Sequence, residues 1–136
     1  MTLVEFPDAE PNGLAAMIGG LLEANLAAHP ERAELLTPAV VGVMAQDAHV
    51  SITIDISPNR VVVRNGLAPR TDVTVRTDSE TLTELSTTPL RLGYPDAMKA
   101  DGRKITRKLL AGELAVRGLL RHPVIVSRLN RLLAVD

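Results

Sequence analysis

The sequence contains no cysteine and no tryptophan, and its only aromatic residues are Phe6 and Tyr94. The absence of cysteine excludes disulfide bonds, thiolate metal sites and a cysteine nucleophile. With so few aromatic side chains, the protein lacks the stacking platforms on which single-stranded nucleic acids bind. No apolar run approaches the ~20 residues of a membrane-spanning helix, and the N-terminal segment lacks the basic start and apolar block of a signal peptide. We therefore expect a soluble, cytoplasmic protein.

The composition is that of an ordinary globular chain with an aliphatic core. Of the 136 residues, 46% are hydrophobic and 23% are charged, which excludes global disorder. A chain of this size buries roughly 68% of its unfolded surface, so it can form a core without covalent cross-links. We expect a single domain over residues 1–136, in which the proline-containing residues 1–12 form a loose N-terminal arm.

The net charge of −1 is the sum of two halves of opposite sign. Residues 1–102 carry 14 acidic and 7 basic side chains, whereas residues 103–136 carry 8 basic and 2 acidic ones. The simpler interpretation is that basic helix faces complement an acidic half of the same domain. The alternative is a surface that meets anionic lipid headgroups or an acidic partner. No nucleic-acid recognition motif accompanies the basic residues, so we expect no nucleic-acid partner.

The sequence shows no arrangement of residues that would support catalysis or metal binding. His29, His49 and His122 lie far apart and lack the spacing of zinc ligands. The nucleophile elbow G-x-S-x-G and the phosphate-binding glycine loops are absent. We therefore expect no catalytic residue, no metal and no cofactor.

The hydrophobic periodicity predicts an α+β fold. A spacing of three and four residues predicts helices, and alternation predicts half-buried strands. Strands are expected over residues 39–45, 50–56, 60–64, 72–76 and 114–117, and helices over 14–29, 78–85, 103–111 and 122–133, with a helical turn over 31–36. Short connections within the central strands favour an antiparallel meander. The result is a five-stranded, mostly antiparallel sheet with helices covering one face.

Three local features refine this prediction. Thr77 and Glu80 have the spacing of a capping box, which places a helix start there. The pair Gly19-Gly20 weakens the first helix unless it permits a close approach to the sheet. Gly112 and Gly118 bracket the last strand, where they can end one helix and release the chain into the next.

The segment RKLLAGELAVRG, residues 107–118, resembles the C-terminal signature of the sterol carrier protein 2 (SCP2) family. In that signature an apolar helix leads into Gly-[Lys/Glu]-Leu-x-[Ile/Val]-x-Gly. The strand DVTV at residues 72–75 and the capped helix over 78–85 are similar to the family's upstream block, in the same order and at similar spacing. The resemblance covers residues 14–133.

The resemblance implies a non-enzymatic lipid-binding or carrier protein that holds a fatty acid, acyl-CoA or sterol-like ligand in an aliphatic cavity. It carries no catalytic residue over to this chain. By position, the expected lining residues are Leu82, Leu85, Ile105, Leu109, Leu114, Val116, Leu120, Ile125 and Leu129. Arg117 and Arg121 are expected at the rim of the pocket, where they could meet an anionic headgroup. The lack of aromatics, the insertion over residues 88–101 and the absence of a peroxisomal tripeptide indicate a bacterial-type, stand-alone relative.

Two other functions stay open on the sequence alone. The same fold with a filled core would serve as an interaction or dimerisation module, accessory to a separate enzyme. An enzyme would need a buried carboxylate facing the cavity, for which Asp55 and Glu113 are the candidates. We expect a monomer or weak homodimer, in transient, salt-sensitive contact with anionic membrane at most.

Overall fold

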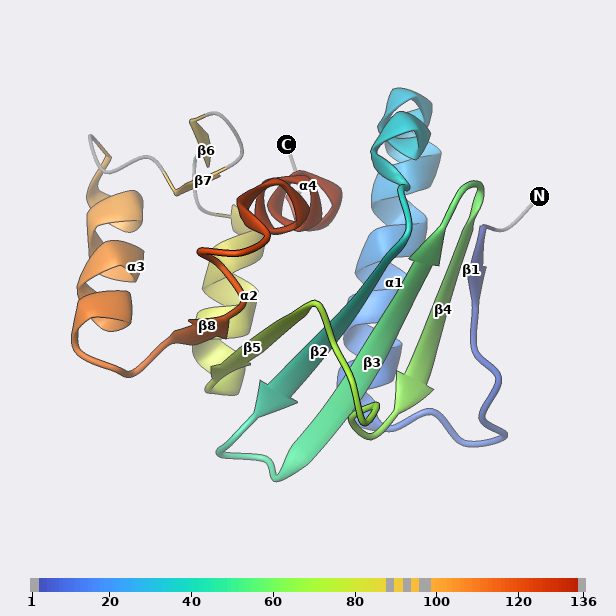
Figure 1. Cartoon of the computed structure of the whole chain (residues 1–136), viewed down its shortest axis with the longest axis horizontal. Coiled ribbons are helices and arrows are strands. Elements are labelled where there is room, and N and C mark those ends of the chain that lie inside the picture. Colours follow the sequence, from blue (N-terminus) through green and yellow to red (C-terminus); the bar gives the residue numbers. More distant parts are fainter. Residues whose placement is uncertain (1–2, 88–89, 92–93, 96–98, 135–136) are drawn as a thin grey trace.

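The structure is a computed structural model that describes residues 3–87, 90–91, 94–95 and 99–134. A six-stranded sheet lies beside a set of helices (Figure 1). In spatial order the strands are β1 (Val4–Glu5), β4 (Arg60–Asn65), β3 (Val50–Ser57), β2 (Ala39–Ala45), β5 (Val73–Thr77) and β8 (Ala115–Arg117). The helices are α1 (Gly13–Ala28), α2 (Ser79–Thr87), α3 (Ala100–Leu110) and α4 (Pro123–Leu133), with a 3-10 helix η1 (Pro30–Leu35). The predicted α+β class is confirmed.

The strands β2, β3 and β4 form the expected antiparallel meander, but β5 does not continue it. β2 pairs with β3, and β3 pairs with β4, both antiparallel. The chain then crosses the sheet through residues 66–72, and β5 pairs parallel to β2 on the other side (Figure 1). β8 adds antiparallel to the outer edge of β5. Among the described residues, five strand pairings hold this six-stranded sheet together, and only β2–β5 and β1–β4 are parallel, so the sheet is mostly antiparallel as predicted.

Alternation along each strand gives the sheet one apolar face and one mixed face. Val41 and Val43 of β2, Ile52 and Ile54 of β3, and Val73 of β5 are almost fully buried. Their strand neighbours point to the opposite face, because successive side chains of a strand alternate. The helices cover the apolar face, and α1 lies against β3 and β4. The crossing segment 66–72 runs over the other face.

The N-terminal segment is not a loose arm, and this prediction is wrong for residues 4–6. β1 pairs parallel with β4, and Val4 is buried in the core. The Phe6 ring packs onto α1 at Gly19, where an added Cβ would lie 2.3 Å from a ring carbon. Gly19 therefore permits a close approach of Phe6 rather than of the sheet. A strand of two residues is too short for hydrophobic periodicity to reveal. For this reason the sequence predicted five strands, whereas the sheet has six.

The predicted capping box at the start of α2 is shifted by one residue. Asp78 is the N-cap, because its Oδ1 accepts a hydrogen bond from the Thr81 backbone N–H at 2.7 Å. The hydroxyl of Thr77 instead donates to the carbonyl of Glu113, 2.9 Å away, beside β8. The carboxylate of Asp47 accepts a hydrogen bond from the Ser79 N–H at 2.9 Å. These bonds hold the pKa values of Asp47 and Asp78 below their ordinary range.

The C-terminal segment completes the helical layer. α4 packs against α1 and α2, and the amide of the buried Asn25 donates to the Leu132 carbonyl at 3.0 Å. β6 (Leu90–Arg91) and β7 (Tyr94–Pro95) form a separate two-stranded sheet within residues 88–101, which the sequence comparison with the SCP2 family marked as an insertion. No helix in the described ranges combines the length and apolar character needed to cross a bilayer.

Candidate functional site

A small apolar pocket lies where α1, α2 and α4 meet strands β2 and β5. Its volume is about 30 Å³. The lining consists of aliphatic side chains and one amide: Ile18, Leu21, Val43, Val75, Leu82, Leu129, Asn130 and Leu133. Ligand pockets usually measure roughly 300–1,000 Å³, so this space admits no more than a water-sized group in the present conformation.

Most of the predicted lining residues belong to the core around this pocket. Leu82 and Leu129 line the pocket itself. Ile105 of α3 and Leu114, just before β8, are buried in the same hydrophobic cluster. Two partly buried residues, Val116 and Ile125, pack against the cluster. Their contact with a ligand stays a prediction.

Two predicted lining residues lie at the surface, and one falls outside the described part. Leu120 is 96% exposed, because it occupies the turn between β8 and α4 rather than a helix face. Leu109 is 38% exposed near the C-terminal end of α3. These two side chains are not enclosed by the core. The side chain of Leu85 lies outside the described residues.

Sequence reasoning missed the half of the pocket that comes from the N-terminal elements. Ile18 and Leu21 lie on the apolar stripe of α1, while Val43 and Val75 lie on the buried faces of neighbouring strands β2 and β5. Each of them falls within a helix or strand that the sequence predicted. Only the parallel pairing of β5 with β2, which the sequence did not predict, brings the two valines together under α4.

A polar clamp beside the pocket ties α3 to α2. The carboxylate of Glu84 accepts hydrogen bonds from the ammonium groups of Lys104 at 2.8 Å and Lys108 at 3.1 Å. Lys108 also donates to the hydroxyl of the buried Thr81 at 2.7 Å. The hydrogen bond from Lys104 is the main reason that the pKa of Glu84 lies below its ordinary range. The clamp fixes α3 so that Ile105 remains in the core.

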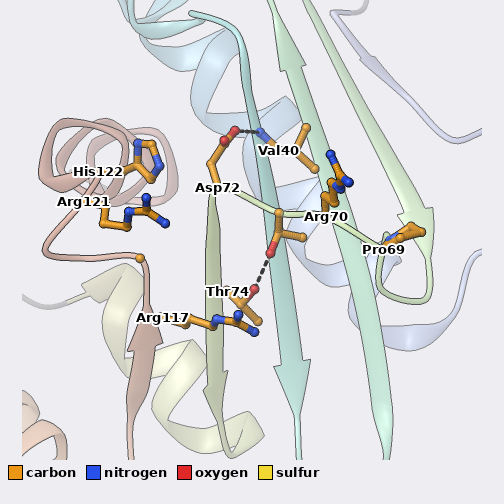
Figure 2. A pocket seen from close by; sticks show the side chains of 10 residues that line it. Val40, Pro69, Arg70, Asp72, Thr74, Arg117, Arg121 and His122 are labelled. Atoms are coloured by element: carbon orange, nitrogen blue, oxygen red, sulfur yellow. Dashed lines mark hydrogen bonds between the residues drawn. The ribbon is translucent and has the colours of Figure 1, made fainter.

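Arg117 and Arg121 come together, but not at the rim of the apolar pocket. Arg117 alternates with the core-facing Val116, so it lies on the opposite face of the sheet. There both arginines line an open groove of about 700 Å³ (Figure 2). The predicted rim position is therefore wrong, because the sheet separates these side chains from the pocket.

The carboxylates considered for catalysis do not face the apolar pocket. Asp55 is half-buried on the mixed face of the sheet, with Arg64 at 3.9 Å. Glu113 is exposed before β8. In the part of the chain that the structure describes, no three His, Asp or Glu side chains gather where they could hold a metal ion.

Comparisons with known proteins find similarity at the level of structure. No family model matches the sequence, and no curated protein matches it. A structure named UbiJ-SCP2, a ubiquinone synthesis protein, superposes with a TM-score of 0.62 at 22% identity and covers 88% of this chain and 92% of its own. A conserved hypothetical protein from Thermus thermophilus, suggested to be a sterol carrier protein, covers 93% and 91% with a TM-score of 0.45 at 12% identity.

The chain has the SCP2-like fold. This assignment rests on the first of the two superpositions, which spans nearly the whole of both chains. The signature segment takes the predicted form, since α3 ends before Gly112, β8 follows, and the chain turns at Gly118 into α4. At 22% identity the SCP2-like fold is shared, and function has to be argued separately.

Proposed function

We propose that the chain is a non-enzymatic lipid-binding protein that holds the apolar part of a fatty acid, acyl-CoA or sterol-like ligand. The observation that carries this proposal is the SCP2-like fold, shared with UbiJ-SCP2 over 88% of this chain. That relative is named for ubiquinone synthesis, which extends the candidate ligands to quinone-type lipids. We also propose a carrier role in the cytoplasm; the carrier role is supported by the aliphatic interior of the described residues.

The pocket bounded by Leu82, Leu129 and Leu133 marks the proposed position of the lipid chain. It lies between helices α1, α2 and α4 and the apolar face of the sheet, so all its walls except Asn130 are aliphatic. A lipid chain entering here must separate α4 from β2 and β5, because about 30 Å³ is too small for it. Side-chain and helix displacements of this kind replace core contacts by ligand contacts of the same apolar character.

The proposal is tested by titrating delipidated protein with a fluorescent long-chain acyl probe, then displacing the probe with fatty acids, acyl-CoA, sterols and quinones. We expect saturable binding of one probe per chain and selective displacement by one ligand class. If the folded protein shows no saturable binding, the lipid-binding proposal fails.

Two substitutions on α4 locate the site. Leu133→Trp places a large ring at the partly buried wall of the pocket, whereas Val124→Trp places the same ring at a position that is 56% exposed. We expect at least a tenfold loss of probe affinity for the first and no change for the second. Each variant also introduces the only tryptophan of the chain, so energy transfer to the probe reports its distance. Equal affinities of the two folded variants would refute this location.

The small pocket volume favours a second candidate, an SCP2-fold interaction or dimerisation module with a filled core. In the residues that the structure describes, the packing beneath α4 is close to that of a solid interior. Three exposed apolar side chains, Leu110, Leu120 and Val124, are available for contact with another protein. Sedimentation of the delipidated protein over a range of concentrations tests self-association, and failure of the acyl-probe titration would favour this candidate.

A further inference from the structure

The mixed face of the sheet carries a groove that plays no part in the proposed lipid site. The groove lies where the N-terminal end of β2, the segment before β5 and the turn after β8 meet (Figure 2). Val40, Thr74 and Arg117 alternate with core-facing residues, so the groove and the apolar pocket lie on opposite sides of one sheet. A headgroup of a lipid held in the pocket could not reach the groove through the sheet.

The groove is lined by three arginines and one histidine from two distant parts of the sequence. Arg117, Arg121 and His122 come from β8 and the turn that follows it, and Arg70 comes from the crossing segment. Within the described ranges, no ion pair or hydrogen bond engages the guanidinium groups of the three arginines. With three arginines and Asp72 in its lining, the groove therefore presents a net positive charge to solvent.

The one acidic residue in the groove already has a structural role. The carboxylate of Asp72 accepts a hydrogen bond from the Val40 N–H at 2.8 Å, and the Asp72 N–H donates to the Val40 carbonyl at 2.7 Å. This pair joins the start of β2 to the start of β5. Figure 2 shows the Asp72 carboxylate turned toward Val40, with Arg121 and His122 on one side and Arg117 beside Thr74.

The segment that carries Arg70 is held in place on the sheet. The hydroxyl of Thr53 on β3 donates to the Gly66 carbonyl and accepts from the Ala68 N–H, both at 2.8 Å. Asp72 anchors the other end of the segment through Val40. The arginines on both sides of the groove thus project from backbone that is fixed by hydrogen bonds.

We propose that this groove binds the phosphoryl group of an organic phosphate. Guanidinium groups form bidentate, charge-assisted hydrogen bonds with phosphate oxygens, and three arginines against one engaged aspartate leave an excess of positive charge for a dianion. The volume of about 700 Å³ exceeds what phosphate alone requires. An adjoining hollow of about 360 Å³ shares Thr71, Thr74 and Arg117 with the groove and includes Met44 and Leu67, which would contact the organic part of the ligand.

The phosphoryl group could belong to a soluble ester or to a phospholipid headgroup, and two arms of one experiment distinguish these sources. Calorimetric titration with inorganic phosphate, pyrophosphate and phenyl phosphate tests soluble ligands. Flotation with phosphatidylcholine vesicles, with and without phosphatidic acid, tests the headgroup. Citrate serves as an anion without phosphorus.

The double variant Arg117→Gln/Arg121→Gln should lose at least tenfold in affinity for whichever source binds. Arg107→Gln, which removes an exposed arginine of α3 outside the groove, should change affinity less than twofold. We also expect phenyl phosphate to bind more tightly than inorganic phosphate, because only the ester reaches the adjoining hollow.

Three results would overturn the proposal: no binding in either arm, citrate binding as tightly as pyrophosphate, or equal losses in the groove and control variants. Acyl-probe binding is measured on the same variants and should not change, since the groove and the pocket lie on opposite faces. The two proposals can therefore fail separately.

Discussion

Alanine at Gly118 should destabilise the protein far more than alanine at Gly112. Both glycines have left-handed backbone, with φ of +89° at Gly118 and +79° at Gly112. A Cβ at Gly112 would meet no atom within 4 Å, whereas a Cβ at Gly118 would lie 2.3 Å from the carbonyl oxygen of Asp72. Comparing the two alanine variants therefore separates the free-energy cost of a left-handed backbone from the additional cost of a steric clash.

The magnitude follows from these two terms. Left-handed backbone costs an alanine about 1–2 kcal/mol, which applies to both variants. Forcing an extra carbon into a packed site costs about 1–3 kcal/mol more, which applies to Gly118 alone. Asp72 cannot easily move away, because its backbone and its carboxylate are both hydrogen-bonded to Val40. We expect a loss of about 1 kcal/mol for Gly112→Ala and about 3 kcal/mol for Gly118→Ala.

Urea unfolding followed by far-ultraviolet circular dichroism measures this difference. With a denaturant slope of about 2 kcal/mol per M, the midpoint should fall by about 0.5 M for Gly112→Ala and about 1.5 M for Gly118→Ala. Gly20→Ala, in helical backbone with open space around its Cβ, should not lower the midpoint. Equal shifts for the two left-handed positions would refute the close approach of β8 to Asp72.

Three further predictions concern polar groups. Asp78→Ala removes the N-cap of α2 and should cost about 1 kcal/mol in urea unfolding, while Asp78→Asn, which keeps an acceptor, should cost a few tenths at most. Asn25→Ala leaves the Leu132 carbonyl without its buried donor and should cost about 1–3 kcal/mol; a variant as stable as the parent would contradict the bond. In the folded state the pKa values of Asp47, Asp78 and Glu84 lie below their ordinary values of 3.8, 3.8 and 4.5. The ionised carboxylates therefore stabilise the fold fully at a pH above the ordinary pKa values. This contribution is lost as the pH falls through the lowered pKa values of the folded state. The melting temperature should therefore begin to fall below about pH 4.5 and fall less in Glu84→Gln; a parent curve that is flat down to about pH 2 would contradict this.

Local patterns in the sequence were sufficient to predict most of the elements. The alternation from Val50 to Ile56 predicted both β3 and its buried face, and the stripe from Leu14 to Leu26 predicted α1. The segment over residues 107–118 indicated the order of helix, strand and helix, and that order is confirmed by the structure. These features depend on contacts between near neighbours in the chain, so the sequence expresses them directly.

Where local signals were weak or ambiguous, the predictions were wrong. β1 has two residues and pairs with a strand more than 50 positions away, so no period could reveal it. Thr77 and Asp78 are both good N-cap residues. Thr77 does not cap the helix, because its hydroxyl donates a hydrogen bond to the Glu113 carbonyl beside β8. Such choices depend on which distant backbone groups need a partner, and that information is not local.

Composition and local patterns were enough to establish the α+β class, the aliphatic core and the segment over residues 107–118 that resembles the SCP2 signature. The side of the sheet on which each candidate residue lies became known from the three-dimensional arrangement of the strands. The crossing of residues 66–72 places Arg70 in the same groove as Arg117 and Arg121, although 46 positions lie between the first two. The parallel pairing of β5 with β2 likewise brings Val43 and Val75 together in the apolar pocket, which side chains of α1, α2 and α4 complete. The physical reason is that a strand's period assigns a side chain to one of two faces, whereas the pairing of strands determines its neighbours on that face.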